Sequence, residues 1–384
     1  MNSVSDSDRS SATKHSVSQE ELAGLLQFFS PAGEGVSFYL GWPDVPNNAH
    51  RLEEIALKDL LRGAAHSSSG EMPTGIAADL KKIRGRLEGV RSDANKLHVV
   101  FACHGEGLWH DFELPCRSPW NIGEVGQYLR VAPLMSAVQR TSPYGVVLVE
   151  FGKARAFVVH GAESKEIAGA IASTDLSIHV DDARVGWSGH IDSNLNDRKR
   201  AFLKHLAERI QEFTKSEGLE SLIVGCRKDL WSELEPQFEN TGRLRMATFH
   251  LPNFEMGGAE VVRHAEPLFL SLEKERIDNA LHRVKENPRA SAVGTDEVLA
   301  LLAEGNVSLI VLGAMADEVV TECRSCNRMT VGTPSKCSLC GGTYMGHLPA
   351  NEAILRKAAA CGAEVLFADS AQVTFNGVAA LLRH

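Results

Sequence analysis

The stretch CRSCNRMTVGTPSKCSLC (residues 323–340) contains two Cys-x-x-Cys pairs, Cys323/Cys326 and Cys337/Cys340. Each pair can place two thiolates in one tight turn, and two such turns can close a tetrahedral shell around a cation such as Zn²⁺. Because the protein would supply all four ligands, no coordination position is left for a reacting water, and the ion is predicted to be structural. The sequence therefore predicts a zinc ribbon at residues 321–346.

Two disulfides are the alternative for these four cysteines. The chain begins with a Ser-rich segment that has no apolar signal region, and it contains no apolar run of transmembrane length. We therefore expect a cytoplasmic protein, in a compartment where thiols stay reduced. Metal binding is the preferred interpretation.

The sequence on both sides of this stretch alternates between strand and helix patterns. Short apolar runs predict strands, and apolar residues at spacings of three and four predict helices. The strands are expected at residues 307–313, 363–369 and 377–384, and the helices at 297–305 and 352–361. Residues 260–384 are therefore predicted to form an α/β/α sandwich that the zinc ribbon interrupts.

Two further segments with mixed strand and helix patterns precede this sandwich. The first, residues 21–141, has predicted strands at 35–42 and 96–105 and predicted helices at 50–65 and 76–90. The second, residues 142–251, opens with a predicted hairpin, YGVVLVEFGKARAFVVHG (144–161). Residues 1–20 are predicted to be a disordered tail, and residues 252–259, which contain Gly257-Gly258, a linker to the third segment. The fold class is therefore α/β, with three mixed α/β domains.

The order of these parts resembles the three-domain archaeo-eukaryotic class I peptide release factors, a superfamily that includes Pelota and bacterial release-factor-like members. The resemblance is carried by GVSFYL, KLHVVFACHG, the 144–161 hairpin and the pattern of strands and helices after residue 294. Archaeal release factors carry a zinc-bearing minidomain at the position of the cysteine stretch. The resemblance implies a ribosome-associated termination or rescue factor that hydrolyses peptidyl-tRNA through the central-domain loop, residues 181–196.

The central loop departs from the release-factor pattern. Release factors have a Gly-Gly-Gln tripeptide here, whereas this chain has Gly186-Trp187-Ser188-Gly189-His190 and no glutamine between Gln139 and Gln211. Gly186 and Gly189 would still let the backbone approach an ester. Ser188 or His190 would orient water.

Basic residues beside this loop are candidates for contact with tRNA phosphates, which guanidinium and ammonium groups bind. They are Arg184, Arg198, Lys199 and Arg200.

Two alternatives stay open for the loop. In one it is an exposed connector whose polar residues cap the following helix, and the protein is a non-catalytic, Pelota-like adaptor that binds the ribosome and tRNA. In the other it is the catalytic loop of a peptidyl-tRNA hydrolase. The sequence leaves open whether the protein is an enzyme.

The overall charge limits the partners. The chain of 384 residues has a net charge of −9 and a pI near 5.9, so it does not coat nucleic acid by bulk electrostatics, and any RNA contact is local. The resemblance implies the ribosome and tRNA as partners and allows for a GTPase. We expect neither a membrane nor DNA among the partners. We also expect loss of zinc to leave the two upstream domains intact, because no predicted contact links the metal to them.

Overall fold

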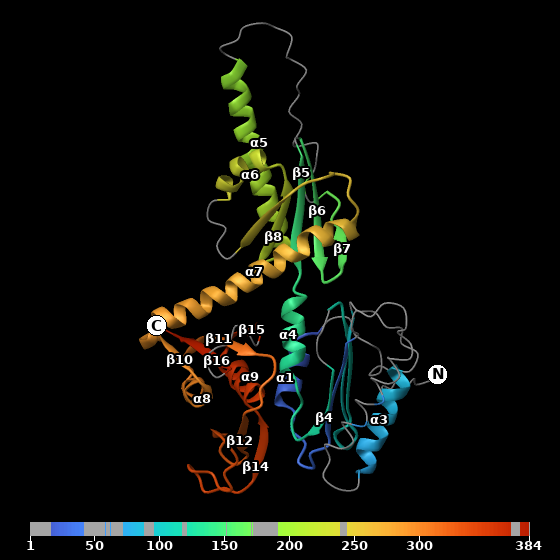
Figure 1. The fold of residues 1–384 in the computed structure, drawn as a ribbon, viewed down its shortest axis with the longest axis vertical. Helices are drawn as coiled ribbons and strands as arrows, with labels where there is room; N and C mark the ends of the chain where they lie inside the picture. Colours follow the sequence, from blue (N-terminus) through green and yellow to red (C-terminus); the bar gives the residue numbers. More distant parts are fainter. Residues whose placement is uncertain are drawn as a thin grey trace, which may run out of the picture. The chain divides into compact units, whose positions relative to one another are not determined.

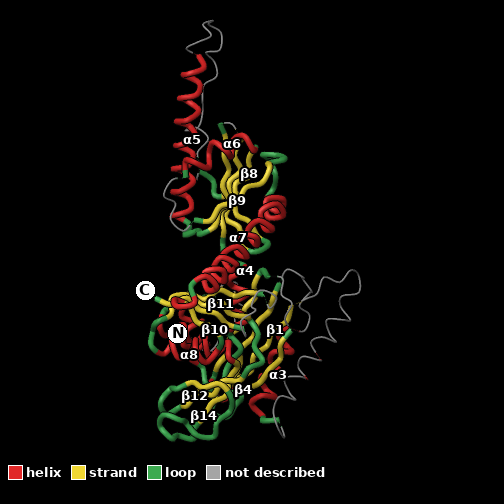
Figure 2. The backbone as a smooth tube through the Cα atoms, turned by 60° about the vertical axis from the view of Figure 1, so that its left-hand side comes forward, coloured by secondary structure: helices red, strands yellow, loops and turns green. Residues whose placement is uncertain are grey.

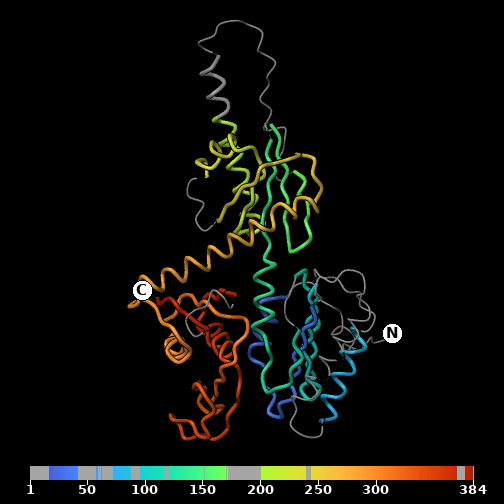
Figure 3. The backbone as a smooth tube through the Cα atoms, in the orientation of Figure 1, coloured from blue at the N-terminus to red at the C-terminus, as the bar shows by residue number. Residues whose placement is uncertain are grey.

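The computed structural model describes residues 17–41, 58, 62, 72–87, 96–116, 121–150, 152–169, 171, 191–238, 244–369 and 377–383. Contacts divide the chain into two compact units (Figure 3). Unit 1 comprises Met1–Thr141 and Arg276–His384, and unit 2 comprises Ser142–Glu275. The predicted helix at 50–65 lies almost entirely outside the described residues, as do residues 1–16 of the predicted tail. The three-domain division stays a prediction.

The first sheet of unit 1 has the strand order β3-β2-β1-β4, with antiparallel neighbours. Its strands are β1 (Gly35–Gly41), β2 (Leu97–Cys103), β3 (Leu108–Leu114) and β4 (Ile122–Gly126). Phe38 on β1 packs against helix α3 (Thr74–Leu87), and the next residue, Tyr39, packs on the opposite face with α1 (Gln19–Gln27) and α4 (Ala132–Arg140). Since both faces are covered, β1 and β2 are buried along their whole length.

The second sheet of unit 1 has the order β10-β16-β11-β15 (Figure 1). Its strands are β10 (Ser291–Val293), β11 (Val307–Gly313), β15 (Glu364–Ala368) and β16 (Val378–Leu382); β11 and β15 run parallel. Helices α8 (Thr295–Ala303) and α9 (Ala350–Cys361) cover one face, and the end of α7 (Gly258–Glu286) covers the other with Ile277 and Leu281. This arrangement is the predicted α/β/α sandwich.

A small third sheet is inserted between β11 and α9. Strands β12 (Val319–Cys323), β13 (Met329–Val331) and β14 (Met345–Pro349) form it in the order β13-β12-β14, with antiparallel neighbours. Figure 2 shows these strands and their long connecting loops at the lower end of unit 1. The predicted cysteine insert is therefore a separate layer of structure within the third predicted domain.

Unit 2 is built on a five-stranded sheet with the order β7-β6-β5-β8-β9. The strands are β5 (Tyr144–Glu150), β6 (Lys153–His160), β7 (Glu163–Glu166), β8 (Ser221–Cys226) and β9 (Arg245–His250). β5 and β6 form the predicted hairpin, and β5, β8 and β9 are parallel. Helices α5 (Ile191–Ser216) and α6 (Lys228–Leu234) pack on one face, and the first half of α7 packs on the other.

Three local features differ from the sequence prediction. Helix α1 begins at Gln19, inside the predicted tail, because Ser18 and Glu21 form a reciprocal capping box. The helix predicted at 352–361 begins two residues earlier, at Ala350, so Asn351 does not cap it, and the Asn351 amide donates to the carbonyl of Ala314 at 2.7 Å. Helix α7 begins at Gly258, within the predicted linker, and the boundary between the two units falls inside this helix.

The described part of the chain also contains short 3₁₀ turns at His104–Glu106, Glu235–Gln237 and Pro288–Ala290. Among the described residues, none of the helices combines the length and the apolar character that a bilayer crossing requires.

Candidate metal centre

The four cysteines of the insert lie in two turns with the same backbone design. Cys323 ends β12, and its carbonyl accepts from the N–H of Asn327 at 2.8 Å; the carbonyl of Cys337 accepts from Gly341 at 2.9 Å. Asn327 and Gly341 each stand four residues after the first cysteine of a pair, and both have left-handed φ values, 59° and 71°. Only such residues let the chain turn back this tightly after the second cysteine.

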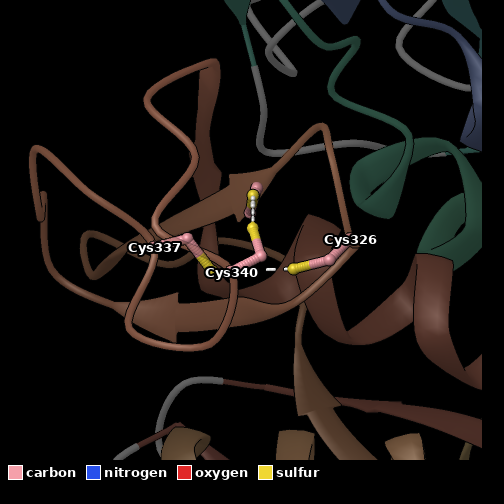
Figure 4. A group of neighbouring side chains, drawn as sticks. Cys326, Cys337 and Cys340 are labelled. Carbon is pink, nitrogen blue, oxygen red and sulfur yellow. Dashed lines mark hydrogen bonds between the residues drawn. The ribbon is translucent and has the colours of Figure 1, made fainter.

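These turns bring the four sulfur atoms together (Figure 4). All four Sγ atoms lie within 4.8 Å of one another, and the pairs Cys323–Cys340 and Cys326–Cys337 are 3.6 Å apart. A tetrahedron with metal–sulfur bonds of about 2.3 Å has sulfur–sulfur edges of about 3.8 Å. The sulfur atoms therefore already have the spacing of a four-coordinate metal site, and they are unbonded thiols.

Backbone groups favour the thiolate form that a metal requires. The N–H groups of Cys340 and Leu339 lower the pKa of Cys337 to about 6, and the N–H of Leu339 lies 3.4 Å from the Cys337 sulfur. The N–H of Ser325 similarly lowers the pKa of Cys323. One thiolate in each turn is thus favoured before any metal binds. The four cysteines can hold a metal ion with no further ligand.

A buried polar cluster beside this centre was not predicted from the sequence. Glu322, the residue before Cys323, is only 4% exposed and accepts hydrogen bonds from Tyr128 at 2.6 Å and from Arg324 at 2.8 Å. Burial, with the Glu322 carboxylate next, raises the pKa of Tyr128. The expectation that no contact links the metal insert to the upstream segments is therefore wrong. Tyr128 and Glu322 are 194 residues apart in the sequence, so no local sequence pattern predicts their contact.

The predicted catalytic residues Gly186, Ser188, Gly189 and His190 lie outside the described residues, as does Arg184. The other predicted RNA contacts, Arg198, Lys199 and Arg200, lie in helix α5, and Arg200 is exposed. Both the catalytic and the RNA-binding assignments stay predictions.

Unit 2 contains a cavity that the sequence did not suggest. It has a volume of about 410 Å³ and lies where the parallel strands β5, β8 and β9 end, at Glu150, Cys226 and His250. Crevices at the carboxyl ends of parallel strands are common ligand sites. Its polar lining residues include Arg227 and Asp229, which pair with each other at 2.9 Å. The sequence feature that could have predicted this cavity is the presence of polar residues directly after apolar strands.

Comparison with protein families identifies the middle of the chain. Residues 130–269 match the family described as "Bacterial archaeo-eukaryotic release factor family 10". This segment is release-factor-like. The match includes α4, the complete sheet of unit 2 and the first part of α7. The release-factor resemblance predicted from the sequence is confirmed there.

No curated protein matches the chain significantly in sequence. The chain also matches solved structures, among them the archaeal translation termination factor aRF1, with 14% identity, 96% of this chain and 99% of that chain covered, and a TM-score of 0.24. Ribosome-bound archaeal Pelota, solved with ABCE1, has 13% identity, coverage of 97% and 95%, and a TM-score of 0.41. The Dom34 protein of S. cerevisiae has 13% identity, coverage of 75% and 79%, and a TM-score of 0.38.

Proposed function

We propose that the protein is a ribosome-associated factor of translation termination or rescue, acting in the cytoplasm. The observation that carries this proposal is the family match of residues 130–269 to bacterial archaeo-eukaryotic release factors. A four-cysteine insert within the α/β/α sandwich, downstream of that segment, agrees with the order of parts noted in the sequence. The ribosome and tRNA are the proposed partners, and a GTPase is a further candidate.

In the catalytic version of this proposal, the loop at residues 181–196 enters the peptidyl transferase centre. Gly186 and Gly189 let the backbone approach the ester of peptidyl-tRNA, and Ser188 or His190 orients the attacking water. Arg184, Arg198, Lys199 and Arg200 bind phosphates of the tRNA and set the orientation of the loop. Arg200 is exposed on α5, as such a contact requires.

A second candidate function is a non-catalytic adaptor that occupies the ribosome while partners perform the chemistry. The observation that favours it is the sequence Gly186-Trp187-Ser188-Gly189-His190, which lacks the glutamine of the release-factor tripeptide. Both candidates require binding to the ribosome and differ only in hydrolysis.

We propose Zn²⁺ as the ion of the four-cysteine site, with a structural role. Four thiolates at tetrahedral spacing suit this borderline-soft cation, which has no geometric preference of its own. The insert has few buried apolar residues from which to build a core, among them Val320 and Leu348. A metal cross-link supplies the stability that such a small core lacks.

Peptide release separates the two candidates. Labelled peptidyl-tRNA on stalled ribosomes is incubated with wild type, His190→Ala and a Gly186→Ala/Gly189→Ala double variant, and released peptide is counted. A hydrolase releases peptide as wild type and loses at least about tenfold in rate in the variants while still binding ribosomes. An adaptor binds ribosomes and releases no peptide in any form. Failure to bind ribosomes contradicts both candidates.

A further inference from the structure

The metal insert is joined to the N-terminal part of unit 1 by a set of contacts that we call the Tyr128 interface. Tyr128 follows β4, and its hydroxyl donates to Glu322 Oε2 at 2.6 Å. Glu322 pairs with Gly346 across β12 and β14. A methyl group on Gly346 would stand 2.2 Å from the Tyr128 hydroxyl oxygen. The tyrosine ring therefore lies directly against this strand pair, where only glycine leaves room for it.

A second set of contacts comes from the residues next to the metal-binding turns. Arg324, directly after Cys323, bonds Glu322 at 2.8 Å and places its guanidinium 4.2 Å from the ring centre of Phe29. Tyr344, four residues after Cys340, meets the same phenylalanine edge-on at 6.1 Å. Phe29 is thus contacted by a residue inside the first turn, Arg324, and by a residue shortly after the second turn, Tyr344.

A backbone contact completes the Tyr128 interface. The N–H of His347 on β14 donates to the Gln127 side chain at 3.1 Å. The guanidinium of Arg356 on α9 lies 4.9 Å from the ring centre of Tyr128 and donates to the carbonyls of Leu26 and Phe28, at the end of α1. The interface therefore holds α1 and the segment after β4 to both the insert and α9.

The buried charge of Glu322 makes this interface sensitive to geometry. Glu322 is only 4% exposed, and its carboxylate accepts hydrogen bonds from Tyr128 and Arg324. A guanidinium nitrogen of Arg356 also lies 3.6 Å from a carboxylate oxygen of Glu322. A buried carboxylate is stable only while such partners stay aligned. Glu322 and Arg324 are the residues directly before and after Cys323. Because Cys323 is one of the four candidate metal ligands, its position determines where both of these charged side chains lie.

We propose that the metal ion in the four-cysteine site acts as a latch that holds α1 and residues 127–130 to the C-terminal part of unit 1. When the ion leaves, the end of β12 loses its cross-link to the second turn, and Glu322 and Arg324 lose their fixed positions. The N-terminal segment is then released from the insert. This inference rests on the proposed metal site, and it adds a long-range consequence to a site that would otherwise stabilise only its own insert.

Linkage makes the effect reciprocal. If the bound metal stabilises the Tyr128 interface, the intact interface must strengthen metal retention by the same factor. A substitution in the interface that leaves all four cysteines untouched must therefore weaken the equilibrium binding of the metal. A cross-link that acts only locally would show no such coupling.

The first test is hydrogen exchange on the full-length chain, before and after zinc is removed with a chelator and its release quantified. The latch predicts that exchange rises about tenfold or more in α1 and in residues 122–131, as well as in residues 319–349. Strands β5 and β8 of unit 2 serve as the internal reference and keep their exchange rates. A rise confined to residues 319–349 overturns the latch although the metal site is real. A purified chain that holds no metal overturns the proposed zinc site, and the latch with it.

The second test uses Gly346→Ala, whose new methyl group pushes Tyr128 away. We expect this variant to hold about one zinc per chain and, in equilibrium competition with a chelator, to bind it at least about fivefold more weakly than wild type. Tyr128→Phe removes only the hydroxyl and should weaken zinc binding by a smaller factor. Gly85→Ala, a helical glycine with nothing within 4 Å of the added methyl group, is the matched control and should behave as wild type. Wild-type zinc affinity in both Gly346→Ala and Tyr128→Phe contradicts the latch.

Discussion

The N-terminal sheet and the metal insert are both small antiparallel sheets within unit 1, but they are held together by different means. All seven residues of β1 and all seven of β2 are buried, with helices packed on both faces. In the insert, the central strand β12 is buried apart from Val319, but β13 is half-buried throughout and β14 is buried only at Gly346 and Leu348. Apolar burial on both faces stabilises the first sheet, whereas we expect the second to depend on its four sulfur atoms and on its neighbours. One unit therefore contains two kinds of stability that respond to different perturbations.

The largest expected effect breaks the insert and spares the core strands of the N-terminal sheet. Cys337→Ser/Cys340→Ser removes two of four ligands, so bound zinc should fall from about one per chain to almost none, since structural zinc supplies on the order of 10 kcal/mol to such sites. Zinc content by elemental analysis checks the loss. β1 and β2 should retain slow hydrogen exchange, because their core does not include the cysteines of the insert. Collapse of β1 and β2 together with the insert would contradict the comparison.

The next effect breaks the N-terminal sheet instead. Phe38 is fully buried against α3, so Phe38→Ala should lower the free energy of unfolding by about 3–5 kcal/mol through lost burial and a residual cavity. Urea denaturation measures the change. Leu339→Ala, a substitution of a 65% exposed residue in the insert, is the control and should cost under about 0.5 kcal/mol. Equal costs for the two variants would remove the distinction between a packed sheet and a cross-linked one.

A third prediction concerns pH. Glu352 on α9 is fully buried and accepts from the N–H of Ala132 at the start of α4, at 3.0 Å; burial raises its pKa from 4.5 to about 7. A raised pKa means that the folded protein binds the proton more tightly than the unfolded chain does. The stabilising contribution is therefore complete below pH 4.5 and is lost as the pH rises through about 7.

Glu352→Gln should remove this pH dependence. The amide keeps the acceptor and carries no charge, so the variant should exceed wild type by about 3 kcal/mol at pH 8 and lose that advantage towards pH 4.5. Arg130 and Glu124, which also act on the pKa of this carboxyl, and Tyr39, whose own pKa Glu352 raises, are unchanged in both proteins. Urea denaturation across this range measures the difference, and parallel profiles for the two proteins would contradict the assignment.

The smallest effect concerns the helix that the Tyr128 interface holds. Ser18 accepts from the N–H of Glu21 at 3.1 Å and begins α1. Ser18→Ala should cost about 1 kcal/mol of unfolding free energy, as measured by urea denaturation. Zinc loss should stay at the wild-type rate, because the serine contacts neither the insert nor Tyr128 in the described structure. A cost above about 2 kcal/mol would show that α1 contributes more to unit 1 than its cap implies.

The four-cysteine site could be predicted because the residues that form it lie within one short stretch of the sequence. Four cysteines at fixed spacing, and glycine after the second pair, specify two turns without reference to the rest of the chain. The same holds for Gly362, which ends α9 with a left-handed φ of 66°, and for the hairpin of β5 and β6. Such features can be predicted from the periodicity of apolar residues and from turn-forming residues in the local sequence.

Features that depend on distant partners were not predictable. Asn351 has the residue type of a helix cap, but its amide donates a hydrogen bond to the carbonyl of Ala314. Helix α9 instead begins at Ala350, directly after Pro349. The contact of Tyr128 with Glu322 joins residues whose local patterns are ordinary. Helix α7 extends into a predicted linker because Val261, Ala265 and Phe269 find an apolar sheet face to cover. In each case tertiary packing overrides the local signal.

Ribosome binding is the property that both proposed functions require, and sedimentation measures it directly. Purified full-length chain is sedimented through sucrose with stalled ribosomes carrying peptidyl-tRNA, with empty ribosomes, and alone. We expect saturable co-sedimentation with stalled ribosomes that weakens as salt is raised, because the proposed RNA contacts are basic residues that would bind phosphates. Protein that stays at the top of the gradient at every ribosome concentration in low salt would contradict it.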